Sequence, residues 1–164
     1  MSTTCLEQLL EIEEEVKATG RLLERIPAGK LGWKPHPRSM SLGQLALHVA
    51  TIPSAVAAEV RTEGTDAGSL VQHPEPQSME EIREAWARNL SAVQDLGADG
   101  DDGTWSVTGR GKALLTLPKK VARRLLMLNH WYHHRGQLTV YLRLLDVPLP
   151  PVYGPSADEN PFAG

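Results

Sequence analysis

The amino-acid sequence predicts an all-α protein, a four-helix bundle, and three observations support this class. Four segments carry apolar residues at helical spacing. Each segment opens on a helix-start signal, and most of the 12 prolines and 14 glycines lie between them. The 164 residues are enough to form one hydrophobic core. We therefore expect one domain that spans residues 1–164.

The first helix is expected from Thr4 to about Arg25. Thr4 and Glu7 have the spacing of a capping box, in which each side chain bonds the other's backbone N–H. Leucine, isoleucine and valine then recur every three or four residues. Pro27 and Gly29 end the pattern, because proline lacks the backbone donor that a helix needs.

The second helix is expected from Ser41, where Gln44 completes another capping box, to about Val60. Its apolar face includes His48, which lies three residues after Leu45. A single histidine on an apolar face is commonly a hydrogen-bonded core residue. His48 therefore needs a partner elsewhere in the chain before it can be interpreted as a ligand.

The third helix is expected from Ser78, with Glu81 in the capping position, to about Leu96. The segment 64–77 before it is polar and rich in glycine and proline, so it is predicted to be a loop that exposes His73. After the third helix, residues 104–116 hold two glycines between apolar residues. This pattern fits either a short hairpin or an ordered crossover.

The last helix is expected to begin at Thr116, with Pro118 in its first turn, and to end near Leu145. Four basic residues crowd its first turns, where the helix dipole disfavours positive charge. They either form an anion site or lie on a solvated face that pairs with the acidic first helix.

Composition narrows the class of function. The formal net charge is −3, which argues against a general nucleic-acid binder. Cys5 is the one cysteine, so the chain has no internal disulfide and no zinc site of several cysteines. No apolar run is long enough to cross a membrane, and the first residues lack the features of a signal peptide. We therefore expect a cytoplasmic protein with no membrane or nucleic-acid partner.

Three histidines lie within five consecutive positions of the last helix. His130 and His134 are four residues apart, so they share one helix face at a spacing that lets two imidazoles bind one metal ion. His133 is an alternative partner for His130, although the pair with His134 follows the apolar stripe better. His48 on the second helix is the candidate third ligand. Three neutral imidazoles would leave one coordination position open for water or substrate.

Three stretches resemble the DinB/YfiT-like family of bacterial metal-binding bundles. They are the Trp33-Lys-Pro sequence, the segment 39–50 that contains His48, and the segment 130–137, which reads His-Trp-Tyr-His-His-Arg-Gly-Gln. The resemblance implies an up-down-down-up bundle, frequent homodimers, and a zinc or nickel ion held by His48, His130 and His134.

The resemblance also implies an activity. Characterised relatives include bacillithiol transferases and mycothiol-dependent maleylpyruvate isomerase, which use a small thiol as co-substrate. We therefore expect a metal-dependent thiol S-transferase that acts on a small molecule. Arg135, Gln44 and Gln137 are candidates for binding a substrate carboxylate or a metal-bound water, and surface or capping roles fit them equally well. Two alternatives remain, a non-catalytic stress-related metal-binding protein and a metal-dependent hydrolase.

Overall fold

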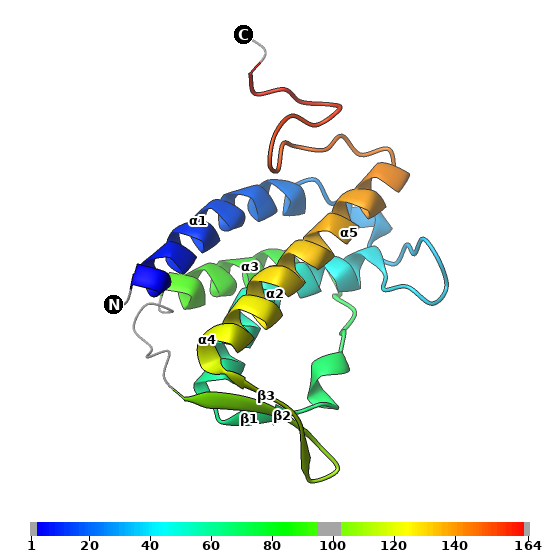
Figure 1. Ribbon diagram of the computed structural model, residues 1–164. Coiled ribbons are helices and arrows are strands. Elements are labelled where there is room, and N and C mark those ends of the chain that lie inside the picture. The colour runs from blue at the N-terminus through cyan, green and yellow to red at the C-terminus, as the bar shows by residue number, and fades with distance from the viewer. Residues whose placement is uncertain (1–2, 95–102, 163–164) are drawn as a thin grey trace.

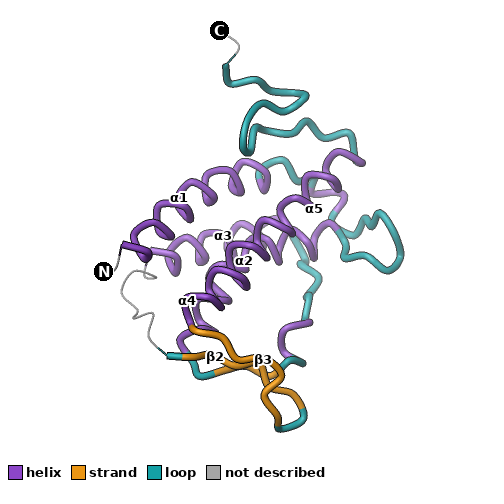
Figure 2. Tube along the Cα trace, viewed as in Figure 1, coloured by secondary structure: helices purple, strands orange, loops and turns teal. Residues whose placement is uncertain are grey.

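The computed structural model describes residues 3–94 and 103–162 (Figure 1). Helices lie beside one another, and three short strands sit at one end of them (Figure 2). No helix in the described ranges has the length and apolar character needed to span a bilayer. The helices are α1 (Thr3–Leu23), α2 (Leu42–Arg61), α3 (Met79–Gln94), α4 (Lys119–Ala122) and α5 (His130–Leu144).

The prediction of an all-α fold is wrong, because a mixed sheet accompanies the helices. Its strands are paired in the order β1-β2-β3, with β1 parallel to β2 and β2 antiparallel to β3. Of the two alternatives left open for residues 104–116, the hairpin is observed. Arg110 and Gly111 form its two-residue turn with φ of 51° and 74°, as tight hairpins require. The strands are β1 (Gly64–Asp66), β2 (Thr104–Gly109) and β3 (Lys112–Pro118).

Strand β1 lies in the segment that was predicted to be a loop. It has only three residues, too few to show an alternating pattern. Gly64 is required there, because a Cβ atom at this position would lie 2.3 Å from the carbonyl oxygen of Ser106 on β2. Strand β1 follows α2, which carries His48, and β3 leads into α4, which continues into α5 with His130 and His134. The sheet therefore connects the two helical segments that carry the predicted ligands.

The last helix begins later than predicted. Thr116 lies in β3, paired with Ser106, and the helix starts at Lys119 after Pro118. The segment Arg123–Asn129 is π-helical and connects α4 directly to α5. Of the two interpretations of the basic cluster, pairing with α1 is observed for Arg124, which lies 2.7 Å from the Glu11 carboxylate.

The other helix boundaries agree closely with the sequence analysis. The Ser41–Gln44 capping box forms in full. Ser78 accepts the backbone N–H of Glu81 at 3.3 Å, as predicted for the start of α3. The predicted capping box of Thr4 and Glu7 lies outside the residues whose side chains are described, and so does the predicted end of α3 at Leu96.

The hydrophobic core lies between the long helices and fixes how α5 faces α2. Trp131 at the start of α5 is fully buried and donates its indole N–H to the carbonyl of Val49 on α2, at 2.9 Å. A smaller apolar cluster of Val60, Trp105 and Ala122 joins the sheet to the bundle. The start of α5 is therefore anchored against α2.

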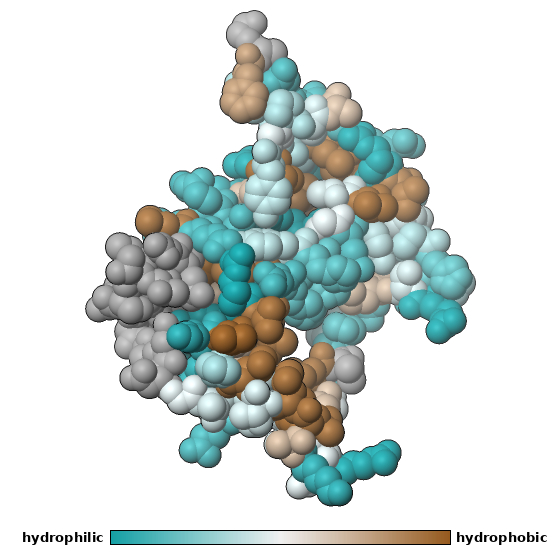
Figure 3. All heavy atoms as spheres, in the orientation of Figure 1, coloured by the Kyte–Doolittle hydropathy of each residue, from teal (hydrophilic) through white to brown (hydrophobic). Residues whose placement is uncertain are grey.

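Some apolar surface remains exposed near the strands. Figure 3 shows hydrophobic side chains gathered in the lower half of the visible face, around the hairpin and the start of the last helix. Leu114 on β3 is 64% exposed, and Leu115 and Leu125 are each 44% exposed. Single exposed leucines are ordinary in proteins, but a group on neighbouring elements is a candidate contact surface.

Candidate metal centre

The three predicted ligands meet between α2 and α5. His48 lies in the first half of α2, and His130 and His134 occupy the first two turns of α5. One ring nitrogen from each lies within 4.8 Å of the other two. The Nε2 atom of His130 is 3.4 Å from that of His48 and 2.8 Å from that of His134. This cluster can hold a metal ion.

The outer nitrogen of His134 has a partner of its own. His134 donates its Nδ1 hydrogen to Oε1 of Gln137, one turn later, at 2.8 Å. His130 turns its Nε2 toward the other two histidines. Metal-binding histidines commonly donate their second nitrogen in this way, and the contact fixes the ring orientation. Gln137 is thus placed to orient His134.

The bond to Gln137 fixes the tautomer of His134. In a neutral imidazole only one nitrogen carries hydrogen. Since His134 donates from Nδ1, its Nε2 atom at the 2.8 Å contact carries a lone pair. That lone pair can accept the Nε2 hydrogen of His130 or bind a metal ion.

The rings are in the neutral form that binds a metal ion. Burial from water, with smaller effects from His134 and His130, lowers the pKa of His48 to about 3. Burial likewise lowers the pKa of His134 to about 4, although its bond to Gln137 opposes the shift. The rings are therefore neutral near pH 7. Tetrahedral zinc with bonds of about 2.05 Å separates its ligand nitrogens by about 3.3 Å. The 3.4 Å between His48 and His130 is close to that value, whereas the 2.8 Å between His130 and His134 must widen to reach it.

Gln44 and His133 lie beside the cluster. The side chain of Gln44 caps α2 and donates to the backbone carbonyl of His73 at 2.8 Å. Gln44 also lines a cavity that reaches His48. His133 is exposed, and its ring centroid lies 4.9 Å from that of His134. Neither residue belongs to the group of three converging nitrogens.

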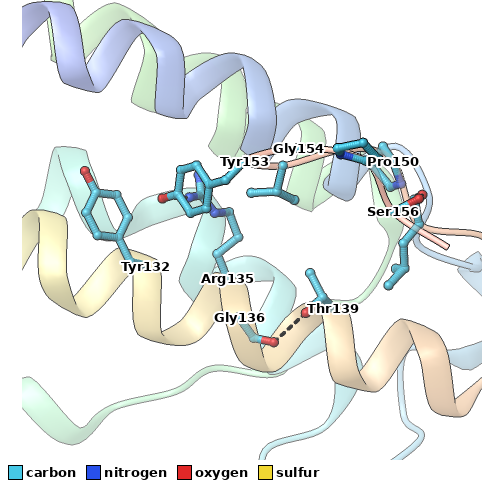
Figure 4. Close-up of a pocket in the computed structure, with 11 residues that line it drawn as sticks. Tyr132, Arg135, Gly136, Thr139, Pro150, Tyr153, Gly154 and Ser156 are labelled. Atoms are coloured by element: carbon cyan, nitrogen blue, oxygen red, sulfur yellow. Dashed lines mark hydrogen bonds between the residues drawn. The ribbon is translucent and has the colours of Figure 1, made fainter. Parts of the chain in front are cut away.

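Arg135 points to the other side of α5, toward α1 and the C-terminal tail (Figure 4). It is 2% exposed and forms an ion pair with Glu15, and its guanidinium also donates to the hydroxyl oxygens of Thr19 and Tyr153. A cavity of about 490 Å³ lies beside it, between α5 and the tail. The structure does not bring Arg135 to the histidine cluster.

Sequence analysis missed one histidine at the centre. His73 was predicted to lie in an exposed loop, but its ring is half-buried and its centroid lies 4.8 Å from that of His48. Nothing in the local sequence signals this placement. Only the path of the segment between β1 and α3, which crosses the start of α2, brings His73 to the cluster.

A cavity adjoins the centre and runs along α2 toward the sheet. Its volume is about 270 Å³, and both His48 and His130 contribute to its wall. The lining mixes aliphatic and polar side chains, with Trp105 from β2 at the sheet end. Glu59 is the acidic residue in this lining. The centre therefore has an adjoining space for a small molecule.

The fold and the cluster define a class, a helical bundle with a three-histidine site for a metal ion between two of its helices. A sequence model of the DinB family matches residues 1–161. Because that match covers nearly the whole chain, this protein belongs to the DinB family.

Three similar proteins agree with that membership. The uncharacterized protein YrdA of Bacillus subtilis strain 168 is 26% identical over 148 residues, which cover 90% of this chain and 86% of YrdA. A DinB-like protein from Bacillus cereus ATCC 10987 superposes with a TM-score of 0.68 at 22% identity, over 90% of this chain and 97% of that one. The DinB-like protein YjoA of Bacillus subtilis gives 0.62 at 22% identity, over 85% and 92%. At this identity the structural likeness supports the fold alone.

Proposed function

We propose that this protein is a metal-dependent enzyme of the thiol S-transferase type, with zinc or nickel at the three-histidine centre. The observation that supports it most is the convergence of three neutral ring nitrogens next to a cavity of about 270 Å³. A metal bound only by neutral ligands keeps its full charge and lowers the pKa of a bound thiol or water.

The residues of the chain have separate tasks in this proposal. Gln137 holds the ring of His134 in the orientation that presents Nε2. Aliphatic side chains such as Ile52 and Leu126 line part of the cavity and would contact the apolar part of an electrophile. Trp105 lines the cavity at the sheet end.

Glu59 is too far along α2 to act as a base at the centre. It lies eleven residues after His48, which corresponds to about 16 Å along a helix. A general base must reach the proton it removes directly or through one water. Glu59 is instead placed to bind a basic group of the substrate at the far end of the cavity.

This placement also bears on the hydrolase alternative. Zinc hydrolases of the His-Glu-x-x-His type place a glutamate beside the metal. The ligand cluster consists of histidines, and Glu59 lies at the far end of the cavity of about 270 Å³. Glu81 lines the second cavity beside His48, and its carboxylate accepts the backbone N–H of Gln77. The geometry therefore favours thiol activation, for which ionisation at the metal is enough.

The proposal is tested with metal-loaded protein made without a histidine tag. The protein is incubated with a panel of low-molecular-weight thiols and 1-chloro-2,4-dinitrobenzene. Formation of the coloured thioether, with loss of chloride, is followed by absorbance. His48→Ala should lose the activity, and His36→Ala, which removes an exposed loop histidine, should keep it.

Other outcomes would replace the proposal. Equal turnover by the His48→Ala variant would remove the metal centre from the reaction. Ester hydrolysis in the absence of any thiol would favour the hydrolase. Stoichiometric metal binding without turnover on either kind of substrate would favour a non-catalytic metal-binding protein.

A further inference from the structure

A fourth imidazole, that of His73, stands beside the three-histidine cluster. The ring of His73 lies nearly perpendicular to that of His48, at 79°, with 4.8 Å between centroids. Its Nδ1 atom is buried and has no hydrogen-bond partner within the described residues. Buried side-chain nitrogens in proteins are nearly always paired, so this one needs an explanation.

The backbone at His73 is held in place although its side chain is not bonded through Nδ1. Gln44 donates to the carbonyl oxygen of His73 at 2.8 Å. Two residues later, the Glu75 carboxylate accepts the hydroxyl of Ser41 at 2.6 Å. Both contacts come from the capping residues at the start of α2, one and two turns before His48. The fold therefore keeps this imidazole next to the cluster.

We propose that His73 is a fourth, displaceable ligand of the metal centre. This inference rests on the proposed metal site and adds to it the residue that fills the open position. Three protein ligands leave one position of a tetrahedral ion vacant. His73 supplies a neutral nitrogen, which is the same kind of ligand as the other three.

The position of His73 in the chain makes it the ligand that can leave. The other three histidines are fixed on α2 and α5, whereas His73 lies in the loop between a short 3-10 helix (Ser69–Val71) and α3. Its nitrogen is also outside the group of three that already converge. A separate cavity of about 260 Å³, lined by His73, His48 and Gln44, gives its ring space to turn away.

In the metal-loaded protein, His73 would then occupy the fourth coordination position and leave it when another ligand binds. When His73 leaves, a lone pair of the incoming molecule replaces the lone pair of its imidazole, and no other bond changes. Weak molecules such as water would then compete poorly with His73, which is held nearby at high effective concentration. A stronger donor such as a thiolate would displace it.

Cobalt(II) provides the test, because its visible absorption reports ligand number and type. Tag-free, metal-free protein is titrated with Co²⁺ as wild type, His73→Ala, His73→Gln and His36→Ala. We expect His73→Ala to bind Co²⁺ on the order of 10- to 100-fold more weakly, the range for residues that support a metal site. Its spectrum should differ from that of wild type, and added imidazole should restore it.

The matched controls separate this inference from the metal site itself. His36→Ala should bind Co²⁺ as wild type does, and His48→Ala should abolish stoichiometric binding. If wild type and both His73 variants share one affinity and one spectrum, His73 is not a ligand, although the three-histidine centre stands. If wild type itself binds no Co²⁺, the proposed centre and the role of His73 fail together.

Discussion

The two sides of α5 bury polar groups in opposite ways. Arg135 and His134 are adjacent in the chain, yet Arg135 turns to α1 and the tail while His134 turns to α2. The guanidinium of Arg135 meets the Glu15 carboxylate and two hydroxyl oxygens. The ring of His134 meets other imidazoles and the amide of Gln137.

The difference indicates which side is structural and which side binds a ligand. On the Arg135 side the buried positive charge is balanced by the Glu15 carboxylate, so no added ion is required to neutralise it. On the histidine side, ring nitrogens of three histidines converge and the Nδ1 atom of His73 has no hydrogen-bond partner among the described residues. Polar groups left incomplete in this way are expected where a cation is to be bound. Four measurements test this contrast.

Among the substitutions, the largest effect on stability is expected at Arg135, on the side where the charges are balanced. Arg135→Ala leaves the buried carboxylate of Glu15 unpaired, and breaking a buried pair typically costs about 3–5 kcal/mol. The free energy of unfolding of the metal-free protein, measured in urea, should fall by that amount. The double variant Arg135→Met/Glu15→Leu, which removes both charges, should recover most of the loss. If the single variant loses less than about 1 kcal/mol, the pair is not structural.

The next effect is expected from the metal. An ion that binds only the folded chain stabilises it by about 2.7 kcal/mol when its free concentration is 100 times Kd. Zinc at that ratio should raise the free energy of unfolding of wild type and of the His36→Ala control. It should leave His130→Ala unchanged. Equal stabilisation of His130→Ala would mean that zinc binds elsewhere.

The third test concerns Gln137, whose side chain orients the ring of His134. Gln137→Leu removes the acceptor that orients His134, and loss of such a partner commonly weakens metal binding by about 10- to 100-fold. Isothermal titration should show this loss, while the stability of the metal-free protein should change little. Gln137→Glu keeps an acceptor at the same reach and is the matched control. A Gln137→Leu variant that binds metal as wild type does would show that His134 is oriented by its packing alone.

The last test varies the pH. The unfolded chain takes up protons on histidine near the ordinary pKa of 6.5, whereas burial lowers the folded-state pKa of His134 to about 4 and of His48 to about 3. Between these values the unfolded chain binds more protons, so the free energy of unfolding falls as pH is lowered. Urea denaturation of the metal-free protein at several pH values measures this slope. His48→Gln/His134→Gln should flatten it, and an unchanged slope would contradict the pKa assignment.

Much of the helical frame was predictable because its signals are local. The capping box at Ser41 and the apolar period after it place α2 correctly. The same period places His48 on the face that meets His130 and His134, so the candidate third ligand could be chosen from its position on the helix.

The features that could not be predicted from the sequence depend on contacts between residues far apart in the chain. Strand β1 exists because it pairs with β2, forty residues later in the chain, and three residues carry no period of their own. His73 reaches the cluster only because capping residues of α2 hold its segment. Arg135 was considered as a substrate-binding group because it follows His134, but consecutive helical residues point about 100° apart.

The π-helical segment Arg123–Asn129 determines how far α5, with His130 and His134, is rotated about the helix axis relative to the part of the helix that follows β3. A π-helical turn holds more residues than an α-helical turn, so each extra residue rotates the later part of the helix by about 100° relative to the earlier part. With one residue deleted there and α-helical bonding restored, the chain entering from β3 would be rotated against His130 and His134. The wide turn thus lets a helix anchored in the sheet at one end still present its imidazoles to α2 at the other.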